Sequence, residues 1–172
     1  MEIDAIVIIP AKADSIRLPK KNKRIIAGKT LLEHSICYAK NSNLVSKIIV
    51  STEDEETKRI AESYGVQVVG RDEEYMGERE VADVYIKIFN DLGNNTRYTH
   101  VVGIQPDHPD RTLLLDDMLQ YAVNNKYDDL FTVNKDGSRN GSIRIIKSSH
   151  VMSGLMSRRV GSMLDILSLI HI

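Results

Sequence analysis

The sequence predicts a doubly wound α/β fold, with a mainly parallel sheet, helices on both faces and a small antiparallel extension near the carboxyl end. Three observations lead to this prediction. Short apolar, β-branched runs alternate with segments of helical spacing, and the connections between them are short. The first run, residues 5–9, is apolar throughout, which is typical of a strand buried on both faces of a parallel sheet. Residues 142–146 instead alternate polar and apolar side chains, as a half-exposed antiparallel strand does.

These elements follow one another in a regular order along the chain. We expect strands over residues 5–9, 47–51, 66–69, 99–104 and 129–133, and helices over residues 30–41, 54–64, 81–92 and 112–124. Gly65 and Gly93 follow the second and third helices, because glycine readily takes the left-handed conformation that closes a helix. Cys37 is the single cysteine and has no partner for an internal disulfide, so we expect a small core residue on the first helix.

Length and composition indicate one ordinary globular domain over residues 1–172, with 42% hydrophobic and 27% charged residues. The net charge of −1 argues against a general nucleic-acid binder, which carries a basic excess over a whole face. The acidic start, residues 1–4, leads directly into a strand and does not look like a secretory signal. No apolar run approaches the roughly 20 residues that span a bilayer. We therefore expect a cytoplasmic protein with no membrane contact.

A basic loop follows the first strand, and six of its fifteen residues, 10–24, are Lys or Arg. In α/β sheets, this position at the carboxyl end of a strand is where phosphates are held. Lys12, Arg17 and Lys21 could neutralise a triphosphate, Ser15 could hydrogen-bond its oxygens, and the Asn22 amide suits base recognition. The loop has neither a Walker pattern nor G-x-G-x-x-G, which disfavours ATPase, kinase and dinucleotide-binding functions. The plain alternative is a solvated run of charges.

A second motif, Gln-Pro-Asp-His-Pro-Asp-Arg, occupies residues 105–111, just after the fourth predicted strand. Asp107 and Asp110 offer hard oxygen ligands suited to Mg²⁺, and His108 could act as a base. Each has a plainer interpretation. Asp110 is equally suited to cap the helix that starts near Thr112, and His108 suits a loop histidine that contacts substrate or solvent.

The first loop and five later landmarks in register resemble the acylneuraminate cytidylyltransferases, the CMP-sialate synthetases and their relatives, over nearly the whole chain to about Asp165. The first loop is similar to their signature I-P-A-R-G-G-S-K-x-L-P-x-K-N, residues 105–111 to Q-P-T-S-P-L-R, and residues 140–143 to N-G-A-I. The matching residues are Ile8-Ile9-Pro10-Ala11-Lys12, Ser15, Arg17-Leu18-Pro19-x-Lys21-Asn22, Gly28-Lys29-Thr30-Leu31-Leu32, Val50-Ser51-Thr52-Glu53-Asp54, Arg71, Gln105-Pro106-x-x-Pro109-x-Arg111 and Asn140-Gly141-Ser142-Ile143.

The resemblance implies a Rossmann-like nucleotidyltransferase that transfers CMP from CTP to the anomeric hydroxyl of a 2-keto sugar acid and releases pyrophosphate. It implies a homodimer, a Mg²⁺ cofactor, and a dimerisation or substrate extension over residues 134–165. The residues implied are Lys12, Arg17 and Lys21 for catalysis, with Ala11, Ser15, Asn22 and Arg71 also holding CTP, Gln105 and Asn140 for the sugar acid, and Asp107 and Asp165 for the metal.

The chain departs from this family at several positions. Lys12 replaces an arginine, and Ala13-Asp14 replaces Gly-Gly. Asp107 falls where the related octulosonate cytidylyltransferases, with Q-G-D-E-P, have a metal-binding aspartate, whereas the sialate type has threonine. Asp165 lacks the second carboxylate of the sialate-type pair.

The end of the chain also differs from the family. Residues 167–172 read like translated adapter sequence, so we expect a chain truncated at its carboxyl end with a non-native tail. The plainer alternative is a genuine apolar tail that packs as a last strand. The alternatives are therefore a nucleotidyltransferase for another base or acceptor, such as the octulosonate type, and a nucleotide-binding module or fragment without turnover. The acceptor stays open among sialic, legionaminic, pseudaminic and octulosonic acids.

Overall fold

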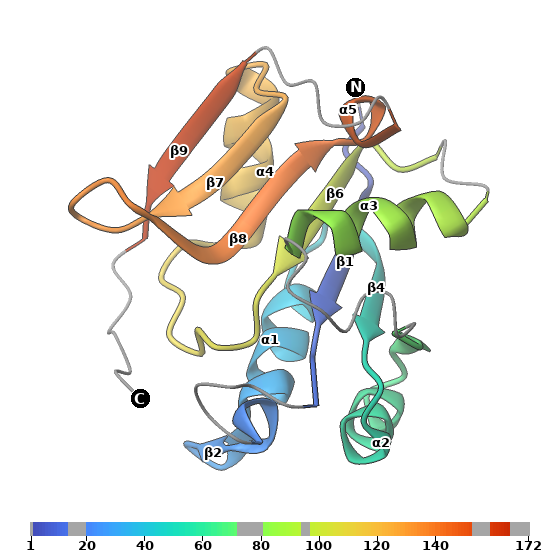
Figure 1. The fold of residues 1–172 in the computed structure, drawn as a ribbon. Helices are drawn as coiled ribbons and strands as arrows, with labels where there is room; N and C mark the ends of the chain where they lie inside the picture. The colour runs from blue at the N-terminus through green and yellow to red at the C-terminus, as the bar shows by residue number, and fades with distance from the viewer. Residues whose placement is uncertain (1, 14–19, 72–80, 94–96, 153–158, 166–172) are drawn as a thin grey trace.

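A mostly parallel sheet forms the centre of the molecule in the computed structural model, which describes residues 2–13, 20–71, 81–93, 97–152 and 159–165 (Figure 1). Within these residues the main sheet has seven strands in the order β5-β4-β1-β6-β8-β7-β9. The strands are β1 (Ala5–Pro10), β4 (Val45–Ser51), β5 (Gln67–Val69), β6 (His100–Ile104), β7 (Asp129–Val133), β8 (Arg139–Lys147) and β9 (Val160–Leu164). A separate hairpin joins β2 (Ile25–Ile26) to β3 (Lys29–Thr30).

The strand order reverses direction beside β1. From β1 the chain first adds the parallel strands β4 and β5 on one side, and then returns to place β6 parallel to β1 on the other. Strand β8 runs antiparallel between β6 and β7, and β9 lies parallel to β7. The carboxyl ends of β1 and β6 therefore flank a topological switch point, the crevice where open α/β sheets bind ligands.

Helices cover both faces of the sheet, as Figure 1 shows. They are α1 (Leu31–Lys40), α2 (Glu55–Ser63), α3 (Val81–Asp91), α4 (Leu115–Asn124) and the short α5 (Ser148–Met152), with a single 3₁₀ turn, η1 (Lys21–Lys23). Helix α1 begins with a capping box, in which the Thr30 hydroxyl accepts from Glu33 N–H and the Glu33 carboxylate accepts from Thr30 N–H. Asp54 caps α2 by accepting from Thr57 N–H at 2.8 Å.

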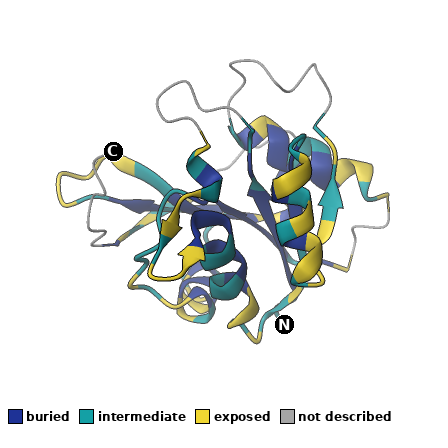
Figure 2. Cartoon of the chain, turned by 90° about the horizontal axis from the view of Figure 1, so that it is seen from below, coloured by how far each residue is buried: buried dark blue, intermediate teal, exposed yellow. Residues whose placement is uncertain are grey.

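Alternation along β1 divides the core into two layers. Ala5, Val7 and Ile9 face α1, α2 and α4, whereas Ile6 and Ile8 face α3 and α5. All five side chains are fully buried, and Figure 2 shows the central strands enclosed between the helices. Strands buried on both faces need apolar residues at every position. No helix in the described part of the chain is both long and apolar enough to cross a membrane.

The structure confirms the predicted fold class but corrects three details. The fourth predicted helix, α4, begins at Leu115 rather than near Thr112, and its N-cap Leu114 makes no side-chain cap, so the alternative of Asp110 as a cap is wrong. Residues 142–146 do form an antiparallel strand, yet β8 lies inside the sheet and is largely buried rather than half exposed. Cys37 is half-buried on α1 and not a core residue.

Candidate functional site

Four segments meet at the edge of the sheet where β1 and β6 end. They are the loop after β1, residues 105–111 after β6, the start of β8 and the end of β9. The antiparallel direction of β8 brings its first residues to this edge, since Ile143 pairs with Ile104 at the end of β6. Strand β9 ends at the same edge, because Leu164 pairs with Val133 at the end of β7. Residues far apart in the sequence therefore come together there.

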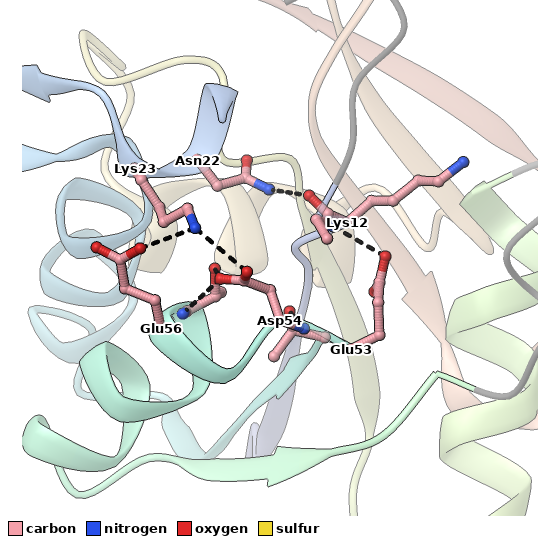
Figure 3. Close-up of polar contacts among 9 residues, drawn as sticks. Lys12, Asn22, Lys23, Glu53, Asp54 and Glu56 are labelled. Atoms are coloured by element: carbon pink, nitrogen blue, oxygen red, sulfur yellow. Dashed lines mark hydrogen bonds and ion pairs between the residues drawn. The ribbon is translucent and has the colours of Figure 1, made fainter. Parts of the chain in front are cut away.

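The first loop is tied down by its own backbone and by Asn22. Ala11 N–H donates to the Ser51 carbonyl at 2.8 Å, which continues the pairing of β1 with β4 by one residue. The Asn22 side chain is 8% exposed, and its amide donates to the Lys12 carbonyl at 2.9 Å, which ties η1 to the loop. Figure 3 shows the amino group of Lys12 directed away from Lys23. Ser15 and Arg17, which the sequence predicts to contact phosphates, lie outside the described residues.

Three acidic side chains at the start of α2 hold this loop. Glu53 Oε1 accepts from Ala13 N–H at 2.9 Å, and Lys23 pairs with Asp54 at 3.2 Å and with Glu56 at 2.8 Å (Figure 3). The hydrogen bond from Lys23 to Glu56, assisted by Asp54, raises the pKa of Lys23. Sequence reasoning missed this use of Glu53. The adjacency of β1 and β4 was the available signal, because residues just after two neighbouring parallel strands meet at one edge.

Lys21 and Asp107 form an ion pair that joins the loop after β1 to the loop after β6. The side chains are 29% and 24% exposed, so the pair is partly withdrawn from water. Burial on its own raises the pKa of Asp107, but the Lys21 hydrogen bond and the charges of His108 and Lys21 hold it below its ordinary value. Asp107 Oδ1 is buried without a hydrogen bond. The pair spans the switch point between β1 and β6.

Arg111 connects the 105–111 loop to helix α1. Its guanidinium donates to the Gln105 carbonyl and to Ser35 Oγ at 3.3 Å, and lies 5.2 Å from the centre of the Tyr38 ring. Burial lowers the pKa of Arg111 to about 10, against the charges of Asp107, Asp165 and Asp110, so the side chain stays charged at neutral pH. A buried cation thus supports both predicted metal-binding carboxylates.

Gln105 and Asn140 lie on facing segments at the same edge. Gln105 N–H donates to the Ser142 carbonyl at 3.2 Å, and the side chain packs against Gly141. Gly141 has φ +75°, and a Cβ there would lie 2.8 Å from Gln105 Nε2. Asn140 Oδ1 accepts from Thr132 Oγ1 at 2.6 Å, whereas Asn140 Nδ2 is buried without a partner. Within the described part of the chain, that amide is a buried donor with no acceptor.

His108 lies beside Asp107 and the backbone of Asn140. Burial lowers its pKa, against the raising effects of Asp107 and of a hydrogen bond with the Asn140 backbone. The ring lies 3.7 Å from Asp107 Oδ1. The fixed contact with the Asn140 backbone suits a structural loop histidine more than a mobile base.

Asp165 follows β9 and is 1% exposed. Its Oδ1 accepts from Thr112 N–H at 3.1 Å and from Thr112 Oγ1 at 2.5 Å, while Oδ2 is buried without a hydrogen bond. Among the described residues, no group of three His, Cys, Asp or Glu side chains could cage a metal. The free oxygens of Asp107 and Asp165 do fit Mg²⁺, which protein sites commonly hold through one or two carboxylates together with substrate phosphates.

Arg71 stands apart from the groups around Asp107. It follows β5, two strands away from β1, and lines a cavity of about 260 Å³ between that edge strand and α3. Val69, Val84 and Ile88 form apolar walls of this cavity, and Lys87 adds a second cation. The structure therefore gathers Lys21, Asp107, Gln105 and their neighbours at the switch point and leaves Arg71 beyond β4.

Comparison with known proteins gives three findings. A family model described as cytidylyltransferase matches residues 6–148. The chain is 30% identical over 155 residues to the N-acylneuraminate cytidylyltransferase of Escherichia coli O18:K1:H7, a match that covers 89% of this chain and 36% of that protein. It is 32% identical over 130 residues to the 3-deoxy-manno-octulosonate cytidylyltransferase of Fusobacterium nucleatum, covering 75% of this chain and 46% of that protein. The chain thus spans less than half of either curated relative.

A solved structure gives the same picture of the fold. The CMP:2-keto-3-deoxy-manno-octonic acid synthetase solved with CTP superposes with a TM-score of 0.70 at 13% identity, covering 94% of this chain and 90% of that one. At this identity the similarity concerns the fold alone.

Proposed function

Because this chain belongs to the cytidylyltransferase family, whose model matches residues 6–148, we propose that it transfers CMP from CTP to the anomeric hydroxyl of a 2-keto sugar acid and releases pyrophosphate. One observation carries the proposal: the segments that hold the cations of the first loop, the amides of Gln105 and Asn140, and the carboxylates after β6 and β9 all lie at the edge of the sheet with the switch point. Such a crevice accommodates a nucleotide with its phosphates on the loop after the first strand.

The first loop is proposed to bind CTP. Lys12, Arg17 and Lys21 are proposed to neutralise phosphates, Ser15 to donate a hydrogen bond to their oxygens, and the backbone of Ala11 to lie against the nucleotide. Asn22 is suited to the cytidine side of the loop, because its buried amide already fixes the backbone of Lys12. Arg71 completes the proposed cytidine contacts from the end of β5.

Gln105 and Asn140 are proposed to hold the sugar acid. The support is the buried Nδ2 of Asn140, a hydrogen-bond donor for which the described residues supply no acceptor. Gly141 keeps the adjacent space free for the Gln105 side chain. A sugar rich in hydroxyl groups offers the acceptor that this amide lacks.

The chemistry proposed is an in-line attack of the anomeric oxygen on the α-phosphorus of CTP, with pyrophosphate as the leaving group. Phosphoryl-group transfer of this kind needs alignment and charge neutralisation more than covalent catalysis. Lys21, with Lys12 and Arg17, supplies positive charge to the phosphates. Asp107 and Asp165 would hold Mg²⁺, which when bound neutralises further phosphate charge.

An octulosonic acid is the second candidate acceptor, and Asp107 is the observation that favours it. The sequence has an aspartate where the octulosonate type has its metal ligand, and the carboxylate lies at the switch point with one free oxygen. We further propose that the enzyme acts in the cytoplasm as a homodimer, with residues 134–165 contributing to the partner contact and to the sugar-acid site.

A pyrophosphate-release assay tests the proposal directly. The protein is incubated with Mg²⁺ and each of the four nucleoside triphosphates, with N-acetylneuraminic acid or 3-deoxy-manno-octulosonic acid as acceptor. We expect release with CTP and one acceptor, and loss of release in Lys21→Ala. CTP binding without release under all conditions would support a nucleotide-binding module instead, and release with another nucleotide would reassign the base.

A further inference from the structure

The two members of the Lys21–Asp107 pair have different proposed ligands. Lys21 is a proposed phosphate contact and Asp107 a proposed ligand of a divalent cation, yet each side chain here binds the other across 86 residues of sequence. A phosphate that takes Lys21 therefore competes with Asp107 for the same ammonium. A divalent cation on Asp107 competes with Lys21 for the same carboxylate.

The surroundings of Asp107 make it unfavourable to remove Lys21 without supplying another cation. Its side chain is 24% exposed and its Oδ1 has no hydrogen bond. Arg111 acts on Asp107 electrostatically, but its guanidinium donates to the Gln105 carbonyl and to Ser35 Oγ. Taking away one partner of a partly desolvated ion pair leaves a charge without its hydrogen-bonded counterion, which is less favourable than exchanging that partner for another.

We propose that the Lys21–Asp107 pair couples the binding of a nucleoside triphosphate to that of a divalent cation. A phosphate that draws Lys21 away leaves Asp107 in need of a cation, and a cation on Asp107 leaves Lys21 in need of an anion. Each ligand therefore raises the affinity of the other, and the coupling is reciprocal. The inference rests on the proposed function for the identity of the two ligands.

A second ion pair, between Lys23 of the first loop and Glu56 of α2, offers a matched control. Glu56 pairs with Lys23 at 2.8 Å, but the Glu56 side chain is 65% exposed and water can replace its partner. Neutralising Glu56 removes the same charge from the same region without releasing Lys21. Comparing the Glu56 and Asp107 variants therefore separates the general effect of removing a negative charge from the specific effect of breaking the Lys21–Asp107 pair.

Isothermal titration of CTP into the full chain, in EDTA and in Mg²⁺, tests the coupling. We expect Asp107→Asn to tighten CTP binding in EDTA by at least about fivefold, the lower end of typical coupling between sites, and to reduce the ratio between the two conditions. We expect Glu56→Gln to change the EDTA affinity by less than about twofold. An unchanged or weaker EDTA affinity in Asp107→Asn overturns the coupling. A wild-type protein that binds no CTP in either condition overturns the proposed function, and the coupling with it.

The reciprocal measurement needs no nucleotide. Mn²⁺ alone is titrated into wild type and Lys21→Met, and free Mn²⁺ is followed by electron paramagnetic resonance. We expect the variant to bind Mn²⁺ at least about fivefold more tightly, because the internal cation no longer competes. Equal or weaker Mn²⁺ binding in Lys21→Met, with the far-ultraviolet circular dichroism of wild type, contradicts the proposal.

Discussion

Replacing Arg111 by Met removes the cation on which the 105–111 loop rests. The buried guanidinium donates to the Gln105 carbonyl and to Ser35 Oγ, lies over the Tyr38 ring, and acts electrostatically on Asp107 and Asp165. A hydrogen bond from a charged group is worth about 1.5–3 kcal/mol, and a buried carbonyl left without its donor costs a further desolvation penalty. Asp107 keeps Lys21, and Asp165 keeps two hydrogen bonds from Thr112, so we expect Arg111→Met to lower the free energy of unfolding by about 3 kcal/mol.

Urea unfolding followed by circular dichroism measures this loss as a lower free energy of unfolding. The matched control is Arg97→Met, since Arg97 also pairs with a carboxylate, Asp4 at 3.4 Å, and lies 5.0 Å from the ring of Tyr98. The Arg97 side chain is 60% exposed, so its loss should cost less than about 1 kcal/mol. A cost for Arg111→Met as small as that of the control would refute the buried-cation reasoning.

Three further predictions follow from single positions. Gly141→Ala should lower the free energy of unfolding by about 1–2 kcal/mol, because φ is +75° and the new methyl group meets the Gln105 side chain. The same variant should raise the KM for the sugar acid. An unchanged urea midpoint together with an unchanged KM would count against the packing described. Ala27→Gly should raise the free energy of unfolding by about 0.5–1 kcal/mol in the same assay, since Ala27 has φ 50° in the turn between β2 and β3. A lower free energy of unfolding would show that this turn carries no backbone strain. Burial lowers the pKa of His100 to about 4 in the folded protein, so the unfolded chain binds the extra proton between about pH 6.5 and 4 and stability falls as pH falls through that window. Between pH 7 and pH 5, the free energy of unfolding of His100→Gln should therefore fall by about 2 kcal/mol less than that of wild type. Equal decreases in the two proteins would show that His100 does not cause the pH dependence.

Local pattern was enough to predict most of the sheet, because strands buried on both faces must be apolar at every position. Residues 5–9 show this, and all five are fully buried in β1. The same rule explains the error at β8: Ser142 and Arg144 suggested an exposed face, but Ser142 is buried, and Arg144 forms a bidentate pair with Asp129 of β7 at 3.0 and 2.6 Å. A polar side chain can be buried in a sheet when a residue on a neighbouring strand pairs with it, and the sequence alone does not reveal that partner.

The candidate site was predictable residue by residue but not pair by pair. Lys21 and Asp107 were both singled out, since one follows the first strand and the other the fourth. Their pairing depends on how two loops after different strands approach each other, which no local pattern contains. The contact of Glu53 with the Ala13 N–H of the first loop was likewise not predicted from the sequence. Long-range contacts between loops therefore had to come from the structure.

The central claim is that the loop after β1 binds the phosphates of CTP through Lys21. Isothermal titration of CTP with Mg²⁺ into wild type and Lys21→Ala tests it most directly. A hydrogen bond to a charged group is worth about 1.5–3 kcal/mol, so we expect Lys21→Ala to weaken CTP binding by about tenfold or more. Equal affinities of the two proteins, or no CTP binding by wild type, would contradict the claim.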